Sequence, residues 1–456
     1  MNVSTQPQEP SRGRSSESFW GNERARRVLR GSDAIAYDTA PTEIARKCPA
    51  LRLGSLDPAD ASVLQSASLA RRRIEQTRPQ SHNVGNRKRT QRFVPASTHT
   101  SSMRPIRSVL MLLQCVRSLT TFPAHAYAKE LNAAVQAVRR AAKITTKLQR
   151  DLANVESATK DDASPVTVAD VAAQCVVIDA LSQLFPDDGF VAEESAADLL
   201  ERGEKRCVEA AADAAGFSVE QLCSIVDTRR PDAKRWWVLD PIDGTKGFMR
   251  GAQYCTALSL IDVYEGDYER EAVVGVLGCP NLERDGSLGG GSDGDGVVVA
   301  AARGAGCFAT PYDTDDWTPL ATNPRSTWTD GLLIEGVAAS HSDHGASERA
   351  ARTLNLKSEP VRLDSQAKHA LLAGGRGDLF TRLPRPGYVE RVWDFAAAKV
   401  VVEEAGGAIT DLRGRPIDVG LGTYLDASVE GIVASGAPAL HSEALAAVNA
   451  GLAAKD

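Results

Sequence analysis

The chain lacks the features that mark a membrane, zinc or disulfide-rich protein. Its 456 residues contain no unbroken apolar run of the roughly 18–20 residues that a membrane span needs. The eight cysteines are scattered, none forms a C-x-x-C pair, and the seven histidines are not spaced near them as zinc ligands would be. Reduced thiols in a reducing compartment are therefore expected, and with no secretory signal this favours the cytoplasm, with mitochondria as the alternative.

Positive charge is scarce beyond the first hundred residues. Residues 1–100 carry 17 Lys and Arg against 9 Asp and Glu, whereas the rest of the chain carries 36 against 50, and the whole has a net charge of −6. This balance argues against nucleic acid as the main partner. A body this acidic would need metal cations to handle phosphates, because the cations offset the repulsion.

Residues 1–105 show no lasting helical or strand period and are rich in Ser, Arg and Pro, which predicts a disordered or targeting extension. Glu9, Glu17 and Glu23 count against a transit peptide. The scattered acids and the lack of interleaved aromatics also weaken nucleic-acid binding by this segment. The basic, apolar stretch that starts at Met103 leaves three interpretations open: a mitochondrial presequence, the start of a shorter protein, or a first helix that packs on the core.

Regular structure is expected from about Tyr127. The order of its helices and strands predicts a layered α/β fold in which an α+β half precedes an α/β half. Residues 125–335 would form an N-terminal subdomain with a metal site and 336–456 a C-terminal subdomain with nucleotide-binding residues. Helical periods cover Leu131–Leu148 and Val168–Phe185. The expected strands are Trp236–Asp240, Cys255–Val263, Ala272–Leu277 and Val297–Ala302. Later helices (near 346–355, 365–373 and 393–405, and from Pro438) alternate with strands (361–363, near 408–411 and 431–435).

The most informative segment runs from Trp236 to Phe248 and reads W-W-V-L-D-P-I-D-G-T-K-G-F. A buried apolar strand is expected to end at Asp240, where Pro241 breaks the ladder of hydrogen bonds. Two carboxylates, Asp240 and Asp243, then lie on one short turn. Hard cations prefer such oxygen ligands. Taken alone, however, D-P-x-D-G is also a common turn sequence.

Three further acids have ordinary explanations when each is taken alone. Glu193, in V-A-E-E-S, suits a helix cap or a solvated face. Asp394 stands where a helix N-cap is expected, and Asp170 suits a cap or first-turn acid. Their order along the chain, together with the D-P-x-D-G segment, is what favours a joint site.

In this order the sequence resembles the lithium-sensitive, magnesium-dependent phosphatases of the inositol monophosphatase superfamily, and most closely its 3′(2′),5′-bisphosphate nucleotidases. The resemblance runs from about Tyr127 to near the C-terminus. Five co-linear stretches carry it: S-P-V-T-V-A-D-V-A-A-Q, F-P-D-D-G-F-V-A-E-E-S, W-V-L-D-P-I-D-G-T-K-G-F-M-R-G, L-D-S-Q-A-K-H and W-D-F-A-A-A-K-V-V-V-E-E-A-G-G. Ala192 stands where this family has Gly. The resemblance implies an inositol-monophosphatase-like sugar phosphatase fold.

The resemblance also implies the parts of a site. Two or three Mg²⁺ ions would be held by Glu193, Asp240, Asp243 and Asp394, together with the carbonyl of Ile242. Asp170 and Thr245 would orient and deprotonate the attacking water. The small-molecule nucleotide would be bound by His341, Ser365, Lys368 and Arg382, where Lys and Arg suit a 5′-phosphate that is not cleaved.

The expected reaction is hydrolysis of adenosine 3′,5′-bisphosphate to AMP and phosphate, with 3′-phosphoadenylyl sulfate as a further candidate substrate. This activity would clear a by-product of sulfur metabolism. An inositol polyphosphate 1-phosphatase would share the metal site, but Lys246, His341 and the L-D-S-Q-A-K stretch argue against it. The alternative that is not an enzyme, a catalytically dead nucleotide sensor, conflicts with the intact Asp170, Thr245 and metal-binding acids. No membrane partner is expected, and the oligomeric state is left open.

Overall fold

The computed structural model describes residues 125–153, 165–263, 270–283, 296–339, 342–356 and 359–454. The extension predicted for residues 1–105, the stretch that starts at Met103 and the candidate residue His341 lie outside these ranges, so they stay predictions.

A seven-stranded sheet occupies the first part of the described chain, and its strand order follows the sequence. β1 runs parallel to β2, and every later pair is antiparallel. The strands are β1 (Gly189–Ala192), β2 (Trp236–Asp243), β3 (Cys255–Val263), β4 (Arg270–Cys279), β5 (Val297–Ala302), β6 (Gly306–Pro311) and β7 (Thr318–Leu320).

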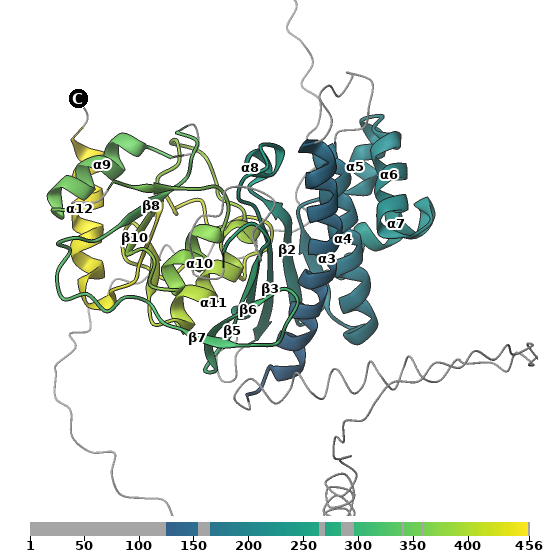
Figure 1. Cartoon of the computed structure of the whole chain (residues 1–456), viewed down its shortest axis with the longest axis horizontal. Coiled ribbons are helices and arrows are strands. Elements are labelled where there is room, and N and C mark those ends of the chain that lie inside the picture. The colour runs from purple at the N-terminus through teal and green to yellow at the C-terminus, as the bar shows by residue number, and fades with distance from the viewer. Residues whose placement is uncertain are drawn as a thin grey trace, which may run out of the picture. The chain divides into compact units, whose positions relative to one another are not determined.

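Helices cover both faces of this sheet, which explains the continuous apolar run in β2. α3 (Ala128–Ala153) and α4 (Pro165–Leu184) pack on one face and α11 (Ala396–Glu404) packs on the other (Figure 1). Successive side chains of a strand point to opposite faces. Trp237 accordingly lies in the core beneath α3 and α4, whereas the next residue, Val238, lies in the core that includes α11.

A second, five-stranded sheet has the order β11-β12-β10-β8-β9. Its strands are β8 (Leu333–Glu335), β9 (Val361–Arg362), β10 (Leu379–Arg382), β11 (Ala408–Asp411) and β12 (Ile432–Ser435). α9 (His344–Thr353) and α12 (His441–Ala453) cover its outer face. α10 (Ala367–Ala373) and α11 lie between the two sheets and share one core with both (Figure 1). This layering confirms the predicted layered α/β fold, while the proposed boundary near residue 335 stays a prediction.

Most predicted elements are present within a few residues of their expected bounds. The sequence missed three short helices that pack near the outer side of α4, and it missed several short strands. The missed helices are α5 (Ala196–Glu201), α6 (Lys205–Ala215) and α7 (Val219–Val226). The 6 residues of α5 are too few for a period to show, whereas α6, with 11 residues, was long enough to be predicted and was missed.

Among the described residues, one stretch, Thr167–Leu184 of α4, is long and apolar enough on average to cross a membrane. In the fold, 61% of it is buried inside the protein. It contacts α3, α6, α7 and β2, and its apolar residues belong to the cores beneath these elements. Packing in the protein core therefore accounts for its composition.

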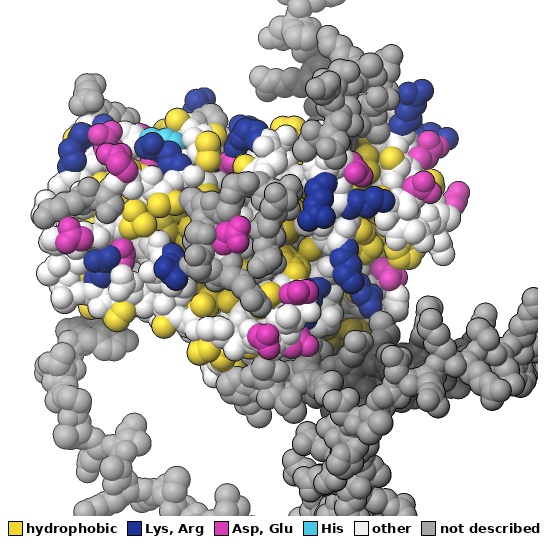
Figure 2. All heavy atoms as spheres, in the orientation of Figure 1, with side chains coloured by type: hydrophobic (Ala, Val, Ile, Leu, Met, Phe, Trp, Pro, Cys, Tyr) yellow, Lys and Arg dark blue, Asp and Glu magenta, His cyan; other side chains and the backbone are white. Residues whose placement is uncertain are grey.

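On the face shown in Figure 2, basic and acidic side chains of the described residues are interspersed. A nucleic-acid backbone attracts basic residues that cluster on one face. The prediction that nucleic acid is not a partner is in keeping with this face, and it stays a prediction.

Gly275 in β4 allows α11 to lie close to the sheet. A Cβ at this position would lie 2.5 Å from the carbonyl oxygen of Ala397 and 3.0 Å from the Cβ of Val400. Because the first of these neighbours is backbone, it cannot move aside as the end of a flexible side chain can.

We therefore expect Gly275→Ala to lower the free energy of unfolding by about 1–3 kcal/mol, the usual cost of overpacking a core. Chemical denaturation monitored by circular dichroism measures this change. Gly336→Ala is a matched control, because a Cβ there meets nothing within 4 Å. Equal stability of the two variants would show that α11 is free to shift away from the sheet.

Candidate active site

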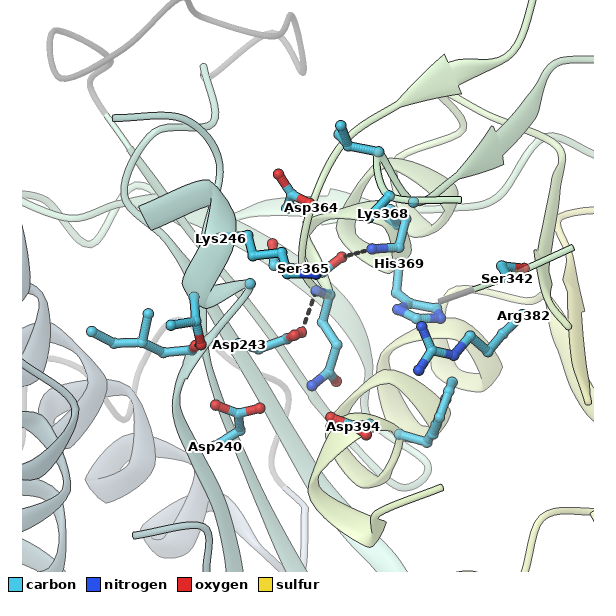
Figure 3. Close-up of a pocket in the computed structure, with 18 of the residues that line it drawn as sticks. Asp240, Asp243, Lys246, Ser342, Asp364, Ser365, Lys368, His369, Arg382 and Asp394 are labelled. Carbon is cyan, nitrogen blue, oxygen red and sulfur yellow. Dashed lines mark hydrogen bonds between the residues drawn. The ribbon is translucent and has the colours of Figure 1, made fainter. Parts of the chain in front are cut away.

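A cavity of about 500 Å³ lies where the end of β2 faces α10 and β10 of the second sheet. Figure 3 shows Asp240 and Asp243 on one side of it and Lys368, His369 and Arg382 on the other, with Asp394 near Arg382 and Asp364 near Lys368. Of the residues predicted for the site, the cavity wall includes Glu193, Asp240, Ile242, Asp243, Thr245, Ser365, Lys368, Arg382 and Asp394. The cavity therefore brings together side chains that are as far as 201 positions apart in the sequence, from Glu193 to Asp394.

The end of β2 differs from the sequence prediction in one respect. Pro241 was expected to end the strand at Asp240, but β2 continues to Asp243, which pairs with Cys255. The ladder is irregular between Asp240 and Asp243, so the proline sits in a bulge, one of the places where a sheet tolerates it. The bulge lets Asp240, Ile242 and Asp243 all line the cavity.

Gly244 joins β2 to the short helix α8 (Thr245–Met249) and adopts a left-handed conformation with φ of 87°. A Cβ on Gly244 would also lie 2.9 Å from the Cβ of Ser365. Both the positive φ angle and the lack of room for a Cβ atom require glycine at this position. The turn thus brings the D-G-T segment against the L-D-S-Q-A-K segment.

Three carboxylates converge in the cavity. One oxygen from each of Asp240, Asp243 and Asp394 lies within 4.8 Å of the others. Asp240 is 3% exposed, and its Oδ1 is buried without a hydrogen-bond partner in the described structure. Burial raises the pKa of Asp240 well above its usual range, and the charges of Glu193 and the other acids raise it further. A buried, partnerless oxygen among mutually repelling carboxylates fits a hard divalent cation.

Asp394 does not serve as the helix cap that its position suggested. It ends the 3₁₀ turn η2 (Val392–Asp394), and the N-cap of α11 is Phe395, with no side-chain capping bond. Burial raises the pKa of Asp394 well above its usual range, as does the charge of Asp243. Its carboxylate is therefore available to the cavity.

Glu193 follows the end of β1 and lies beside Asp240, because its backbone N–H donates to the carbonyl of Leu239. Burial raises the pKa of its carboxyl group. The capping that the sequence suggested is done instead by Ser195, whose hydroxyl accepts from the N–H of Asp198. The two functions of the V-A-E-E-S stretch thus fall on different residues.

Asp170 lies in α4, whereas Thr245 is the first residue of α8. Thr245 begins α8 and lines the cavity, and its hydroxyl donates to the carbonyl of Ile242 at 3.4 Å. Asp170 is 6% exposed and is not among the residues of the cavity wall. It is the sixth residue of α4, so the expected cap or first-turn position is wrong. Burial raises its pKa well above the usual range, with Glu194 and Glu193 adding to the effect.

Hydrogen bonds fix the positions of the basic side chains in the cavity wall. The ammonium group of Lys368 donates to the carbonyl of Ser365 at 2.5 Å, and Ser365 itself adopts a left-handed conformation with φ of 69°. Burial lowers the pKa of Lys368, although the nearby Asp243 opposes this. The Nε of Arg382 donates to Glu390 at 2.7 Å, which fixes the plane of the guanidinium group.

Gln366 is a site residue that the sequence analysis did not single out. Its backbone N–H donates to Oδ2 of Asp243, and its side-chain amide donates to the carbonyl of Trp393 at 3.0 Å. It thereby fixes Asp243 relative to the turn that carries Asp394. The only signal in the sequence was its place inside the L-D-S-Q-A-K stretch.

Comparison with known proteins gives consistent matches. The model of the inositol monophosphatase family matches residues 127–452. A 3′(2′),5′-bisphosphate nucleotidase of Schizosaccharomyces pombe is 38% identical over 320 residues, which cover 65% of this chain and 88% of that protein. One of Emericella nidulans is 36% identical over 353 residues, covering 71% and 98%. A solved inositol monophosphatase from Zymomonas mobilis shares 24% identity with a TM-score of 0.47, covering 72% and 100%.

Proposed function

The chain belongs to the inositol monophosphatase family, and on that premise we propose that it is a 3′(2′),5′-bisphosphate nucleotidase. Its substrate is adenosine 3′,5′-bisphosphate, which it converts to AMP and phosphate, and 3′-phosphoadenylyl sulfate is a second candidate. The observation that carries the proposal is a single cavity whose wall contains both a carboxylate cluster and the cations Lys368 and Arg382. Similarity to relatives named as nucleotidases supports it.

The carboxylate side suits Mg²⁺, in the number of two or three ions that the family resemblance implies. Glu193, Asp240, Asp243 and Asp394, with the carbonyl of Ile242, would hold the ions. When bound, Mg²⁺ supplies positive charge that polarises the phosphate, acidifies water and stabilises the leaving oxygen. Without that charge the dianionic phosphate would repel both the carboxylates and the nucleophile.

Thr245 and Asp170 supply the proton path in this proposal. The hydroxyl of Thr245 orients the attacking water and accepts its proton while it passes its own proton to Asp170. A carboxylate whose pKa is raised by burial holds such a proton better than an exposed one. The water oxygen then bonds to phosphorus as the bond to the 3′-oxygen breaks, and the 3′-oxygen takes up a proton from water to become the hydroxyl group of AMP.

Lys368 and Arg382 hold the phosphate that does not react. Their side chains lie across the cavity from Asp240 and Asp243 (Figure 3). Since Glu390 fixes one edge of the Arg382 guanidinium, the group is ordered before substrate binds. A substrate with two phosphates therefore gains contacts that inositol 1-phosphate cannot make.

The test is identification of the product by chromatography. Adenosine 3′,5′-bisphosphate should yield 5′-AMP and one equivalent of phosphate in the presence of Mg²⁺, and excess EDTA should abolish the reaction. Release of the 5′-phosphate, with adenosine 3′-monophosphate as product, would overturn the proposed orientation of the substrate.

Lithium is expected to inhibit turnover. Li⁺ is close to Mg²⁺ in size but has half its charge, so it can enter a carboxylate site yet polarise water and the leaving oxygen far less. Product phosphate should help to retain it, because each increases the affinity for the other. Steady-state phosphate release against LiCl, with KCl matched for ionic strength, measures the effect. Identical curves for both salts up to tens of millimolar would contradict the prediction.

A further inference from the structure

His369 lies in α10 at the wall of the cavity and is 2% exposed. Neither ring nitrogen, Nδ1 nor Nε2, has a hydrogen-bond partner in the part of the chain that the structure describes. The proposed reaction assigns no role to this side chain. It is therefore a buried polar group whose presence needs an explanation.

The contrast with His441 shows what a buried histidine ordinarily does in this fold. His441 is also buried, but its Nε2 pairs with the hydroxyl of Thr410 and its Nδ1 pairs with the hydroxyl of Ser435, both at 2.8 Å. A buried polar group without a partner costs stability, and Leu or Phe at position 369 would avoid that cost. The unpaired nitrogens of His369 indicate a partner that arrives with a ligand.

The surroundings of His369 define what that partner can be. Its ring lies edge-on to Phe380 at 4.5 Å between centroids, and Phe395 is 6.2 Å away. Burial lowers the pKa of His369 to about 3, and the charge of Lys368 adds to this, so the ring is neutral at physiological pH. A neutral imidazole offers one N–H donor and one acceptor nitrogen.

The charged residues near His369 indicate which chemical group of a ligand its ring would bind. His369 follows Lys368 in the sequence, and the cavity wall that holds these two residues also includes Arg382. A donor in a wall that carries two cations suits an anionic oxygen. We infer that the His369 ring N–H donates a hydrogen bond to the phosphate that is not hydrolysed, which makes His369 a specificity-determining residue of the nucleotide site. This inference rests on the proposed function.

The experiment compares two substrates that differ only in that phosphate. Kinetic constants of the wild type, His369→Leu and His369→Gln are measured with adenosine 3′,5′-bisphosphate and with adenosine 3′-monophosphate. His369→Leu should lower kcat/KM for the bisphosphate about tenfold or more, the loss expected for a hydrogen bond to a charged group, and leave the monophosphate unchanged. His369→Gln keeps an N–H donor and should recover part of the preference.

A binding measurement covers the case in which the monophosphate turns over too slowly. Inhibition by 5′-AMP, which keeps the 5′-phosphate, should weaken about tenfold in His369→Leu, while inhibition by adenosine should not change. His441→Leu serves as a control for loss of a buried histidine. It should lower the melting temperature because it breaks two hydrogen bonds, and it should leave the ratio of kcat/KM between the two substrates unchanged.

The outcomes separate this inference from the proposed function. If the wild type hydrolyses neither substrate, the proposed function fails. If it hydrolyses the bisphosphate and His369→Leu affects both substrates equally, the ring contacts the ribose or base, or acts on the fold, and the inference is overturned. If His369→Leu affects neither substrate, the unpaired nitrogens have no ligand, and the inference is overturned as well.

Discussion

Asp240→Asn and Asp394→Asn should each reduce phosphate release about 10³-fold or more, equivalent to several kcal/mol in the activation barrier. Each change keeps the shape of the side chain but removes a negative charge from a cluster in which three carboxylate oxygens lie within 4.8 Å of one another. A divalent cation loses both affinity and position when such a charge is removed. The measurement is steady-state turnover of adenosine 3′,5′-bisphosphate across a Mg²⁺ titration.

Although the same two variants should lose activity, they should be more stable than the wild type when no metal is bound. Burial, and then repulsion by the neighbouring carboxylates, raises the pKa of both groups, so a neutral amide should raise the melting temperature in EDTA. Asp378→Asn is the matched control, because Asp378 is also buried but is paired with Arg325 and is not among the residues of the cavity wall. It should lose stability and keep turnover below its melting transition. Full turnover by Asp240→Asn at saturating Mg²⁺ would show that Asp240 is not a ligand.

Asp170→Asn should lower kcat by about 10²–10⁴-fold, the usual contribution of a positioned acid or base, without shifting the Mg²⁺ dependence. In the proposed mechanism Asp170 takes the proton of Thr245 and holds no cation, and its position agrees with this, because it is buried in α4 and is not among the residues of the cavity wall. Substrate turnover and the Mg²⁺ concentration at half-maximal rate are measured together.

A double variant tests whether Asp170 and Thr245 act as one unit. If they share one proton path, Thr245→Ala combined with Asp170→Asn should be little worse than either single change, because groups that act together are non-additive. Multiplied losses would indicate two independent functions. Recovery of Asp170→Asn by high Mg²⁺ would place this residue in the cation site instead.

The sequence could predict which acids line the cavity because their stretches follow one another in an order that resembles one family, although each acid alone has an ordinary explanation. It could not decide among the local alternatives. Asp394 has the position of a helix cap, and only the structure shows that Phe395 takes the cap and leaves the carboxylate to the cavity. Likewise, the capping signal in V-A-E-E-S belongs to Ser195, which leaves Glu193 to the site.

Contacts over long sequence separations account for what the sequence could not show. Gln366 bonds to Asp243 across 123 positions, and no periodicity or motif spacing encodes that bond. Among the described residues, the ring nitrogens of His369 have no hydrogen-bond partner, and this is equally invisible in a sequence, because it depends on which side chains, such as Phe380 and Phe395, the fold packs around the ring. The layered fold was easier to predict, since its long helices and strands have clear apolar periods.

In the proposed function, one cavity combines a cation-binding cluster with a site for a second phosphate. The most direct test is the ratio of kcat/KM for adenosine 3′,5′-bisphosphate to that for inositol 1-phosphate, measured side by side at the same Mg²⁺ concentration. We predict a ratio of at least about 10², because only the bisphosphate has a second phosphate that can accept charge-assisted hydrogen bonds from Lys368 and Arg382. Equal values for the two substrates would contradict it.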